Sequence, residues 1–229
     1  MRIVYGALVF SMIGVGAAQA TDFSCPKPIV IPDAWDDTNA NGTYDPGVDV
    51  YDPDVTGYNS AKGGLALSIK PASLLLPITP GGYFQVDFPA LNRGVPLSGN
   101  DWYQKWISEC SPYTLFSADT LMLDSGISDG TTIRAFIDLI NQDPTAYWDG
   151  TSVISPYAKS PRVATMLAYN LTYPPQSGSS VILAKFLSVF IESVGPSSQL
   201  NVRILDATSD VPVPTVPTTW GGLKRRYSN

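Results

Sequence analysis

The stretch "VILAKFLSVFIESV" (Val181–Val194) decides the fold class. It is apolar along almost its whole length, which is typical of a strand buried inside a sheet. The stretch before it, "SPRVATMLAYN" (Ser160–Asn170), has the same character, and "QLNVRILDA" (Gln199–Ala207) alternates apolar and polar residues. Strict alternation indicates a strand with one buried face. We therefore expect several strands in this half of the chain.

Two earlier stretches alternate in the same way. "GLALSIKP" (Gly64–Pro71) predicts a strand with Leu65, Leu67 and Ile69 on one side, and "GGYFQVDFP" (Gly81–Pro89) repeats the pattern. "CPKPIVIPDAW" (Cys25–Trp35) is bounded by prolines and predicts a short extended segment.

One helix is expected with a clear apolar face. "SDGTTIRAFIDLINQDP" (Ser128–Pro144) places apolar residues at i, i+3, i+4 and i+7, namely Ile133, Phe136, Ile137 and Ile140. A shorter helix is expected in "NDWYQKWISEC" (Asn100–Cys110), with Trp102, Trp106 and Ile107 on one side. The predicted class is α+β: predominantly β-sheet, with one or two helices packed on it and many loops.

Composition excludes several functions. The 229 residues include no histidine, which removes a Ser-His-Asp triad, a Cys-His pair and an imidazole metal site. The net charge is -6 and the only basic run is Lys224–Arg226, so we expect no nucleic-acid partner. "GISDG" (Gly126–Gly130) matches G-x-S-x-G, but without a histidine base it is better explained as a helix cap at Ser128.

The two cysteines, Cys25 and Cys110, are far apart in sequence. An even number in an exported chain favours one disulfide that closes a long loop. The alternative is a pair of unpaired buried thiols.

The two ends of the sequence differ from its middle. Residues 1–20, "MRIVYGALVFSMIGVGAAQA", have the layout of a secretory signal peptide, with Arg2 before an apolar stretch and small residues before the expected cut. The alternative is the remnant of an upstream strand or membrane region in a fragment of a longer protein. We expect one domain over residues 21–208 and a flexible, proline-rich tail over residues 209–229.

The stretch "DTNANGTYDPGVD" (Asp37–Asp49) predicts a calcium loop. Oxygen-bearing residues recur at the spacing of an EF-hand loop, and Gly42 stands at the sixth position, where such a loop turns sharply. The twelfth position, which should carry an acid, is Val48, and Asp49 follows it. The alternative is a polar turn without a metal. The predicted ligands are Asp37, Asn39, Asn41, Thr43, Asp45 and Asp49.

Several stretches, taken in order, resemble the C-terminal region of TadG-like proteins, in the TadE/TadG-like group of the Tad (Flp) pilus-assembly machinery. They run from "CPKPIVIPDAWDD" through "LALSIKP" and "DWYQKWISEC" to "IRAFIDLINQDPTAYWDG" and "SPRVATML", and the resemblance covers about Cys25–Leu205. It implies an extracytoplasmic protein, without catalytic activity, that contacts other pilus-assembly or envelope proteins.

The resemblance also bears on single residues. It implies that Cys25 pairs with Cys110, and that the segment from Asp37 to Asp45 matches the acidic Asp-Asn-Gly segment of the family. Relatives often carry an acid where Val48 stands, which weakens the match at the calcium loop. TadG-like proteins also carry an N-terminal transmembrane helix, so membrane anchoring in a longer form is implied.

Two other functions stay open at this point. One is a secreted carbohydrate-binding or adhesive module, for which a surface row of aromatic residues would speak. The other is a hydrolase that uses only carboxylates, for which Asp143 and Asp149 in "DPTAYWDG" are the one tentative pair. Such a pair more often marks the exit of a helix.

Overall fold

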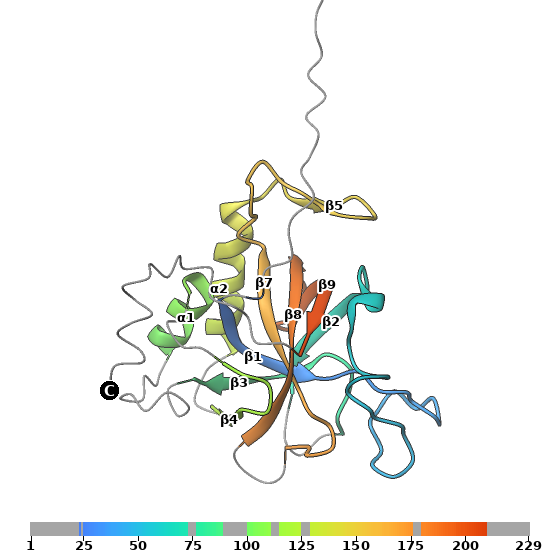
Figure 1. Cartoon of the computed structure of the whole chain (residues 1–229). Coiled ribbons are helices and arrows are strands. Elements are labelled where there is room, and N and C mark those ends of the chain that lie inside the picture. Colours follow the sequence, from blue (N-terminus) through green and yellow to red (C-terminus); the bar gives the residue numbers. More distant parts are fainter. Residues whose placement is uncertain are drawn as a thin grey trace, which may run out of the picture.

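The apolar stretch Val181–Val194 forms most of the longest strand, β8 (Ser180–Val194). The computed structural model describes residues 23, 25–72, 77–88, 100–110, 115–124, 129–175 and 180–209, and it is mostly β-sheet with two α-helices (Figure 1). The other elements are β1 (Pro26–Pro32), the 3-10 helix η1 (Ser60–Lys62), β2 (Ala66–Pro71), β3 (Gly82–Asp87), α1 (Asn100–Ser108), β4 (Thr120–Leu123), α2 (Asp129–Gln142), β5 (Tyr147–Trp148), β6 (Val153–Ile154), β7 (Val163–Tyr169) and β9 (Leu200–Thr208).

The main sheet closes on itself. Its strand order is β1-β7-β8-β4-β3-β2-β9, and the additional pairings β1–β3 and β8–β9 join its distant parts. β8 is long enough to pair with β7 along most of its length, with β4 near its start and with β9 over its second half. The pairs β1–β7 and β2–β3 are parallel, and the rest of this sheet is antiparallel. Closure leaves few free strand edges.

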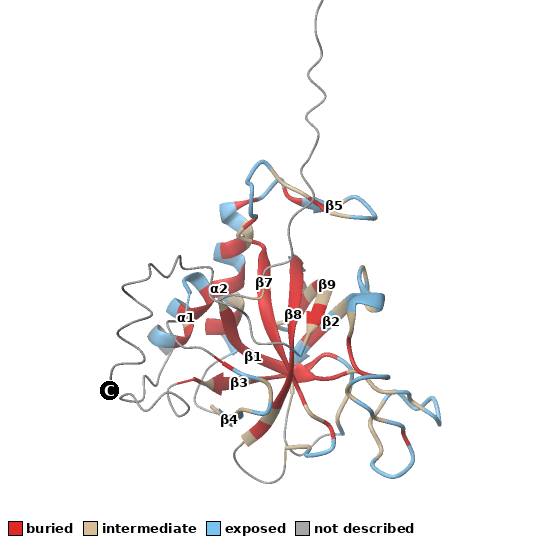
Figure 2. Ribbon diagram, viewed as in Figure 1, coloured by how far each residue is buried: buried red, intermediate tan, exposed pale blue. Residues whose placement is uncertain are grey.

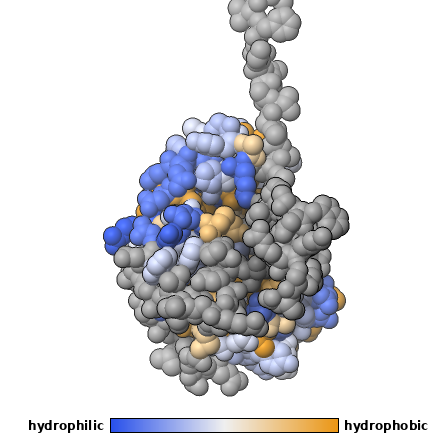
Figure 3. All heavy atoms as spheres, turned by 60° about the vertical axis from the view of Figure 1, so that its left-hand side comes forward, coloured by the Kyte–Doolittle hydropathy of each residue, from blue (hydrophilic) through white to orange (hydrophobic). Residues whose placement is uncertain are grey.

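Both faces of the central strands are buried, which explains their nearly continuous apolar sequences. Leu187, Val189 and Ile191 of β8 belong to the largest core cluster, together with residues of α2, whereas Phe186 belongs to a second cluster. Figure 2 shows the central strands as buried and the outer sides of the helices as exposed. Both helices lie on one side of the sheet, and Figure 3 turns this side forward, with hydrophilic residues gathered toward the top.

The predicted strands and helices all form, but one residue of the predicted apolar face of α2 points to solvent. Phe136 of α2 is fully buried as expected, whereas Ile137 is 37% exposed. The buried face of α2 consists of Thr131, Thr132, Ala135, Phe136 and Leu139. Ile133 and Ile140 are partly buried and pack against the same core cluster.

The fold class is confirmed, including the disulfide between Cys25 and Cys110. Residues 1–20 and 210–229, which carry the predictions of a signal peptide and a flexible tail, lie outside the described residues. Gly126–Ser128 of the G-x-S-x-G match lie outside them as well, and α2 begins at Asp129.

Candidate functional site

The predicted calcium ligands lie in the acidic segment, residues 33–58, which connects β1 to η1. Asp33, just after β1, fixes the root of this segment. Its side chain is fully buried; Oδ1 accepts hydrogen bonds from the backbone N–H groups of Ala34 (2.9 Å) and Tyr58 (2.8 Å), and Oδ2 accepts one from the Tyr51 hydroxyl (3.1 Å). One carboxylate thus ties the start of the segment to its end.

Lys185 holds the same segment from the side of the sheet. This residue is on β8, and its ammonium donates to the backbone carbonyls of Pro53 and Tyr58. Its Nζ is 3.9 Å from Oδ2 of Asp33, and both side chains are buried. Burial raises the pKa of Asp33, and the attraction of Lys185 opposes that rise. Because a buried charge is tolerated only with partners, this pair fixes where the segment crosses β8.

The first predicted calcium ligand, Asp37, folds the tip of the loop. Its Oδ2 accepts the backbone N–H of Gly42 at 2.6 Å, and its Oδ1 accepts that of Asn41 at 3.2 Å. Gly42 has φ +76°, a conformation that favours glycine. The sharp turn expected at the sixth position is therefore present.

Three of the predicted ligands come together around Asp45. The side-chain amides of Asn39 and Asn41 donate to Oδ2 of Asp45, at 2.9 Å and 2.6 Å. Thr43 lies beside them, and its hydroxyl donates to Oδ1 of Asn41 at 2.8 Å. An amide that turned about its last torsion would present oxygen instead of nitrogen at this point. As they lie here, both amides present N–H groups to Asp45, and oxygens of the kind that Ca²⁺ prefers would face this point only after such a turn.

Asp49 has a different place. It is buried, and its two oxygens accept the backbone N–H groups of Thr38 (3.0 Å) and Asp45 (2.7 Å). Val48, at the twelfth position, is 52% exposed. Among the described residues, no three side chains of the Asp, Glu, Cys or His type gather in a group that could hold a metal ion. The Asp49 carboxylate thus closes the loop by binding backbone N–H groups at both of its ends.

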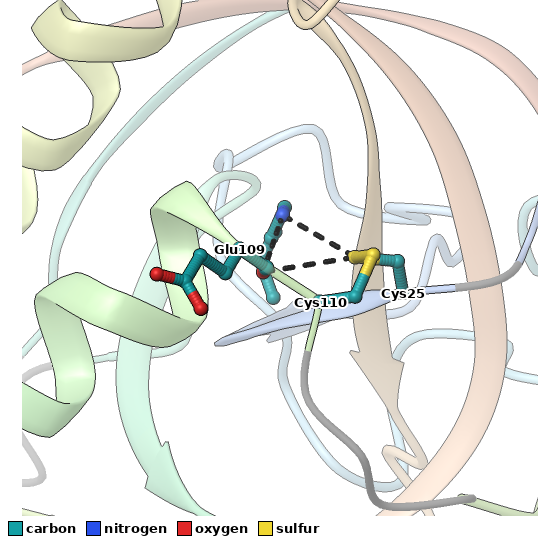
Figure 4. Close-up of a disulfide and its surroundings, with 4 residues drawn as sticks. Cys25, Glu109 and Cys110 are labelled. Atoms are coloured by element: carbon teal, nitrogen blue, oxygen red, sulfur yellow. Dashed lines mark hydrogen bonds between the residues drawn. A yellow bond between two sulfur atoms is a disulfide. The ribbon is translucent and has the colours of Figure 1, made fainter.

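The disulfide joins Cys25, directly before β1, to Cys110, two residues after the end of α1. Cys25 and Cys110 have Cα atoms 4.7 Å apart and are separated by 85 positions in sequence. Figure 4 shows Glu109 beside the bond. The buried ammonium of Lys27 donates to the Glu109 carbonyl at 3.2 Å. Burial, and secondarily the charge of Lys159, lowers the pKa of Lys27 from 10.5 to about 8.

The tentative carboxylate pair occupies two separate networks. Asp143 is fully buried, and its Oδ2 accepts the hydroxyls of Ser155 and Ser160, each at 2.6 Å. Asp149 is exposed, and hydrogen bonds from the backbone of Thr151 and Ser152 lower its pKa. Each carboxylate therefore stabilises its own local structure.

The aromatic residues divide between core and surface. Trp106, Tyr83, Tyr103 and Tyr169 are buried, whereas Tyr147, Tyr157 and Tyr173 are each at least half exposed. On α1, Trp102 stacks on Trp106 with ring centroids 5.9 Å apart.

Besides Lys27, two further buried cations, Lys185 and Arg162, were not foreseen from the sequence. Lys185 interrupts an otherwise apolar stretch, and a lone charge in such a stretch is the signal that points to a buried partner. Arg162, at the start of β7, donates to the backbone carbonyls of Asp143, Ala146, Ile191 and Glu192. It thereby fastens the exit of α2 to β8.

Comparison of the chain with protein-family models, with curated proteins and with solved structures finds no match. Among the residues that the structure describes, no helix is long and apolar enough to cross a bilayer.

Proposed function

We propose that this chain is a non-catalytic assembly protein that acts outside the cytoplasm, by contact with other proteins, in a Tad (Flp) type pilus system. The order of the sequence motifs supports the pilus assignment. The disulfide supports a location outside the cytoplasm, where such bonds persist.

The observation that carries the proposal is the construction of the acidic segment. Its exposed side includes Val48 (52% exposed), Val50 (54%) and Val55 (71%). We infer that a partner protein covers these three apolar side chains, which face water on one well-anchored segment. The anchors are Asp33 and Lys185, which are occupied in holding the segment to the sheet.

The proposal is tested by deleting the gene in its native host. We expect cells without the protein to lose Flp-type pili from their surface, as counted by electron microscopy, and to recover them when the wild-type gene is supplied in trans. Pili in normal number on the deletion strain would overturn the assignment.

The loop around Asp45 completes the proposal as a structural calcium site. Asn39, Asn41, Asp45, Asp37 and Thr43 supply the oxygens. We expect millimolar Ca²⁺ to raise the free energy of unfolding by about 1 to 2 kcal/mol, in the range of weak extracellular sites. The measurement is thermal unfolding of the oxidised protein with Ca²⁺ and then with chelator.

Two variants separate metal binding from loop folding. In Asp45→Ala the midpoint should no longer respond to Ca²⁺. In Asp49→Asn the midpoint should fall even in chelator, because Asp49 holds the backbone of Thr38 and Asp45. If Ca²⁺ leaves the unfolding midpoint of the wild type unchanged, the loop is a polar turn without a metal.

A carbohydrate-binding or adhesive module is the second candidate function. The exposed tyrosines Tyr147, Tyr157 and Tyr173 favour it, since exposed aromatic rings stack on sugars. A glycan array probed with the oxidised protein tests this alternative. The alternative predicts that at least one glycan binds the wild type and that Tyr147→Ala loses this binding.

A further inference from the structure

A groove of about 690 Å³ opens beside the acidic segment and has no role in the function proposed above. Its walls include Trp35 and Tyr58 from the acidic segment, Leu65 and Leu67 around the start of β2, and Pro80. Leu65 is 45% exposed, so the groove presents apolar surface to solvent. Exposed apolar surface in a groove is typical of a binding site for another segment or molecule.

We propose that the groove is covered by residues 211–229 of this chain, "VPVPTVPTTWGGLKRRYSN". This segment brings Pro212, Pro214 and Pro217 close together, and the last two have the P-x-x-P spacing. Proline-rich segments favour a left-handed extended helix, and grooves lined by aromatic rings bind it at low cost in conformational entropy. The half-buried Trp35 supplies such a ring, and the almost fully buried Tyr58 forms part of the wall.

Charge complementarity supports the same occupant. Residues 36–54 contain six aspartates and neither lysine nor arginine, and one of these aspartates, Asp37, lines the groove. The tail carries Lys224, Arg225 and Arg226 within a few residues of its prolines. The groove's own cation, Lys62, donates to the backbone carbonyl of Thr56. Net attraction therefore draws the basic end of the tail toward the acidic segment.

The tail also starts within reach. The backbone N–H of Gly64, in the groove wall, donates to the carbonyl of Ile204 on β9, and the described part of β9 continues to Ser209. The tail therefore leaves the sheet about 15 Å from the groove, at roughly 3.3 Å for each strand residue. The segment 211–229 spans up to about 60 Å at 3.1 Å per residue, so docking within one molecule is sterically easy.

Trypsin digestion of the full, disulfide-closed chain tests this inference. Lys224, Arg225 and Arg226 are cleavage sites, and intact-mass spectrometry follows the loss of the residues beyond them. Cleavage of a docked segment follows the population of its undocked form. We expect cleavage to be about tenfold faster in Leu65→Ser and in Pro214→Ser/Pro217→Ser. Each variant removes apolar surface from the docked contact, and the loss of one buried apolar side chain shifts the docking equilibrium by about that factor.

Met122→Ser on β4 is the matched control, because Met122 is 39% exposed and does not line the groove. Its cleavage rate should equal that of the wild type. Rates that depend on protein concentration would show the tail of a second copy in the groove and would overturn docking within one chain. Equal rates in all four proteins would show that the tail does not dock there at all. Either result leaves the proposed pilus function untouched.

Discussion

Gly57 lies where the acidic segment passes over the buried pair of Asp33 and Lys185. A Cβ atom at this position would be 2.6 Å from Oδ2 of Asp33, 2.6 Å from the carbonyl oxygen of Pro53 and 2.7 Å from Nζ of Lys185. The absence of a side chain is therefore what allows the two charged groups and the backbone to meet. Adding one Cβ atom at Gly57 would therefore disturb the contact that fixes the segment to the sheet.

Gly57→Ala should therefore destabilise the protein by about 2 kcal/mol or more, because the buried pair must separate or the segment must lift. Urea unfolding at pH 7 measures the change. Gly130→Ala is the control: the nearest atom to its Cβ would be 4.0 Å away, on Arg134, and alanine should be neutral or stabilise α2 by up to about 1 kcal/mol. Equal stability of both variants would show that the close approach at Gly57 has no energetic weight.

Lys27 makes stability depend on pH. Its pKa is about 8 in the folded protein and near 10.5 when unfolded, so the unfolded chain binds the extra proton between these values and stability rises with pH there. The full shift corresponds to about 3 kcal/mol. In Lys27→Met the rise in unfolding free energy from pH 7 to pH 9.5 should be much smaller.

Lys27→Met should also be more stable than the wild type at pH 7 by about 1 to 2 kcal/mol, after the loss of its hydrogen bond to Glu109 is subtracted. The exposed Lys70 offers the control variant Lys70→Met, which should keep the wild-type slope. A pH profile of Lys27→Met that overlays the wild type would contradict the assigned burial penalty.

At the scale of elements, Arg162 adds a polar link between the exit of α2 and β8 to the apolar packing that these two elements share. Four backbone carbonyls, two at the exit of α2 and two on β8, accept from the buried guanidinium of Arg162. Asp143 and Ala146 follow the end of α2, and Ile191 and Glu192 lie at a register shift within β8. The planar fork of arginine, rather than its charge alone, suits this geometry.

Arg162→Lys is therefore expected to cost about 3 kcal/mol, because an ammonium cannot reach all four acceptors and leaves some of them buried and unpaired. Arg134→Lys, at an exposed position on α2, should change the unfolding free energy by less than about 0.5 kcal/mol. Chemical unfolding followed by circular dichroism distinguishes the two. If lysine were tolerated at position 162 as well as at position 134, the hydrogen bonds of Arg162 would not stabilise the contact between α2 and β8.

The elements differ in how far sequence predicts them. β7, β8 and β9 follow from their apolar or alternating patterns, because burial of a strand leaves a local signature. The apolar pattern of α2 correctly places Phe136 in the core and Ile133 and Ile140 against it, whereas Ile137 is exposed and the buried Thr131, Thr132 and Ala135 do not stand out in the sequence. β4, β5 and β6 are too short to leave a clear pattern; β4 also depends on β8, about 60 positions away, whereas β5 and β6 pair with each other.

The candidate site was predictable only in its local part. Asp37, Gly42 and Asp45 follow one another at a spacing that indicates a folded loop, and the turn forms as expected. Lys185, which anchors that loop, is more than 120 positions away in the sequence, so no local pattern links the two. The groove likewise arises from separate stretches that only the tertiary fold brings together.

At the scale of the whole molecule, the disulfide and the closed sheet act together. Cys25 and Cys110 enclose 85 positions that contain the acidic segment, β2, β3 and α1. A bond over a loop of this length reduces the entropy of the unfolded chain, which corresponds to about 4.5 kcal/mol in the loop-closure description. The double variant Cys25→Ala/Cys110→Ala should lose a large part of this stability in urea unfolding, and an unchanged midpoint would show that the sheet suffices alone.

The contact surface on the acidic segment is the central claim, and counting pili tests it most directly. The host's own gene would be replaced by Val48→Ser/Val50→Ser/Val55→Ser, and in a control strain by Tyr173→Ser, which changes another exposed side chain. Both proteins should be present at wild-type amounts with unchanged thermal midpoints. The account predicts that cells with the triple variant lose their Flp-type pili and that the control strain keeps them. Normal piliation with the folded triple variant would contradict it.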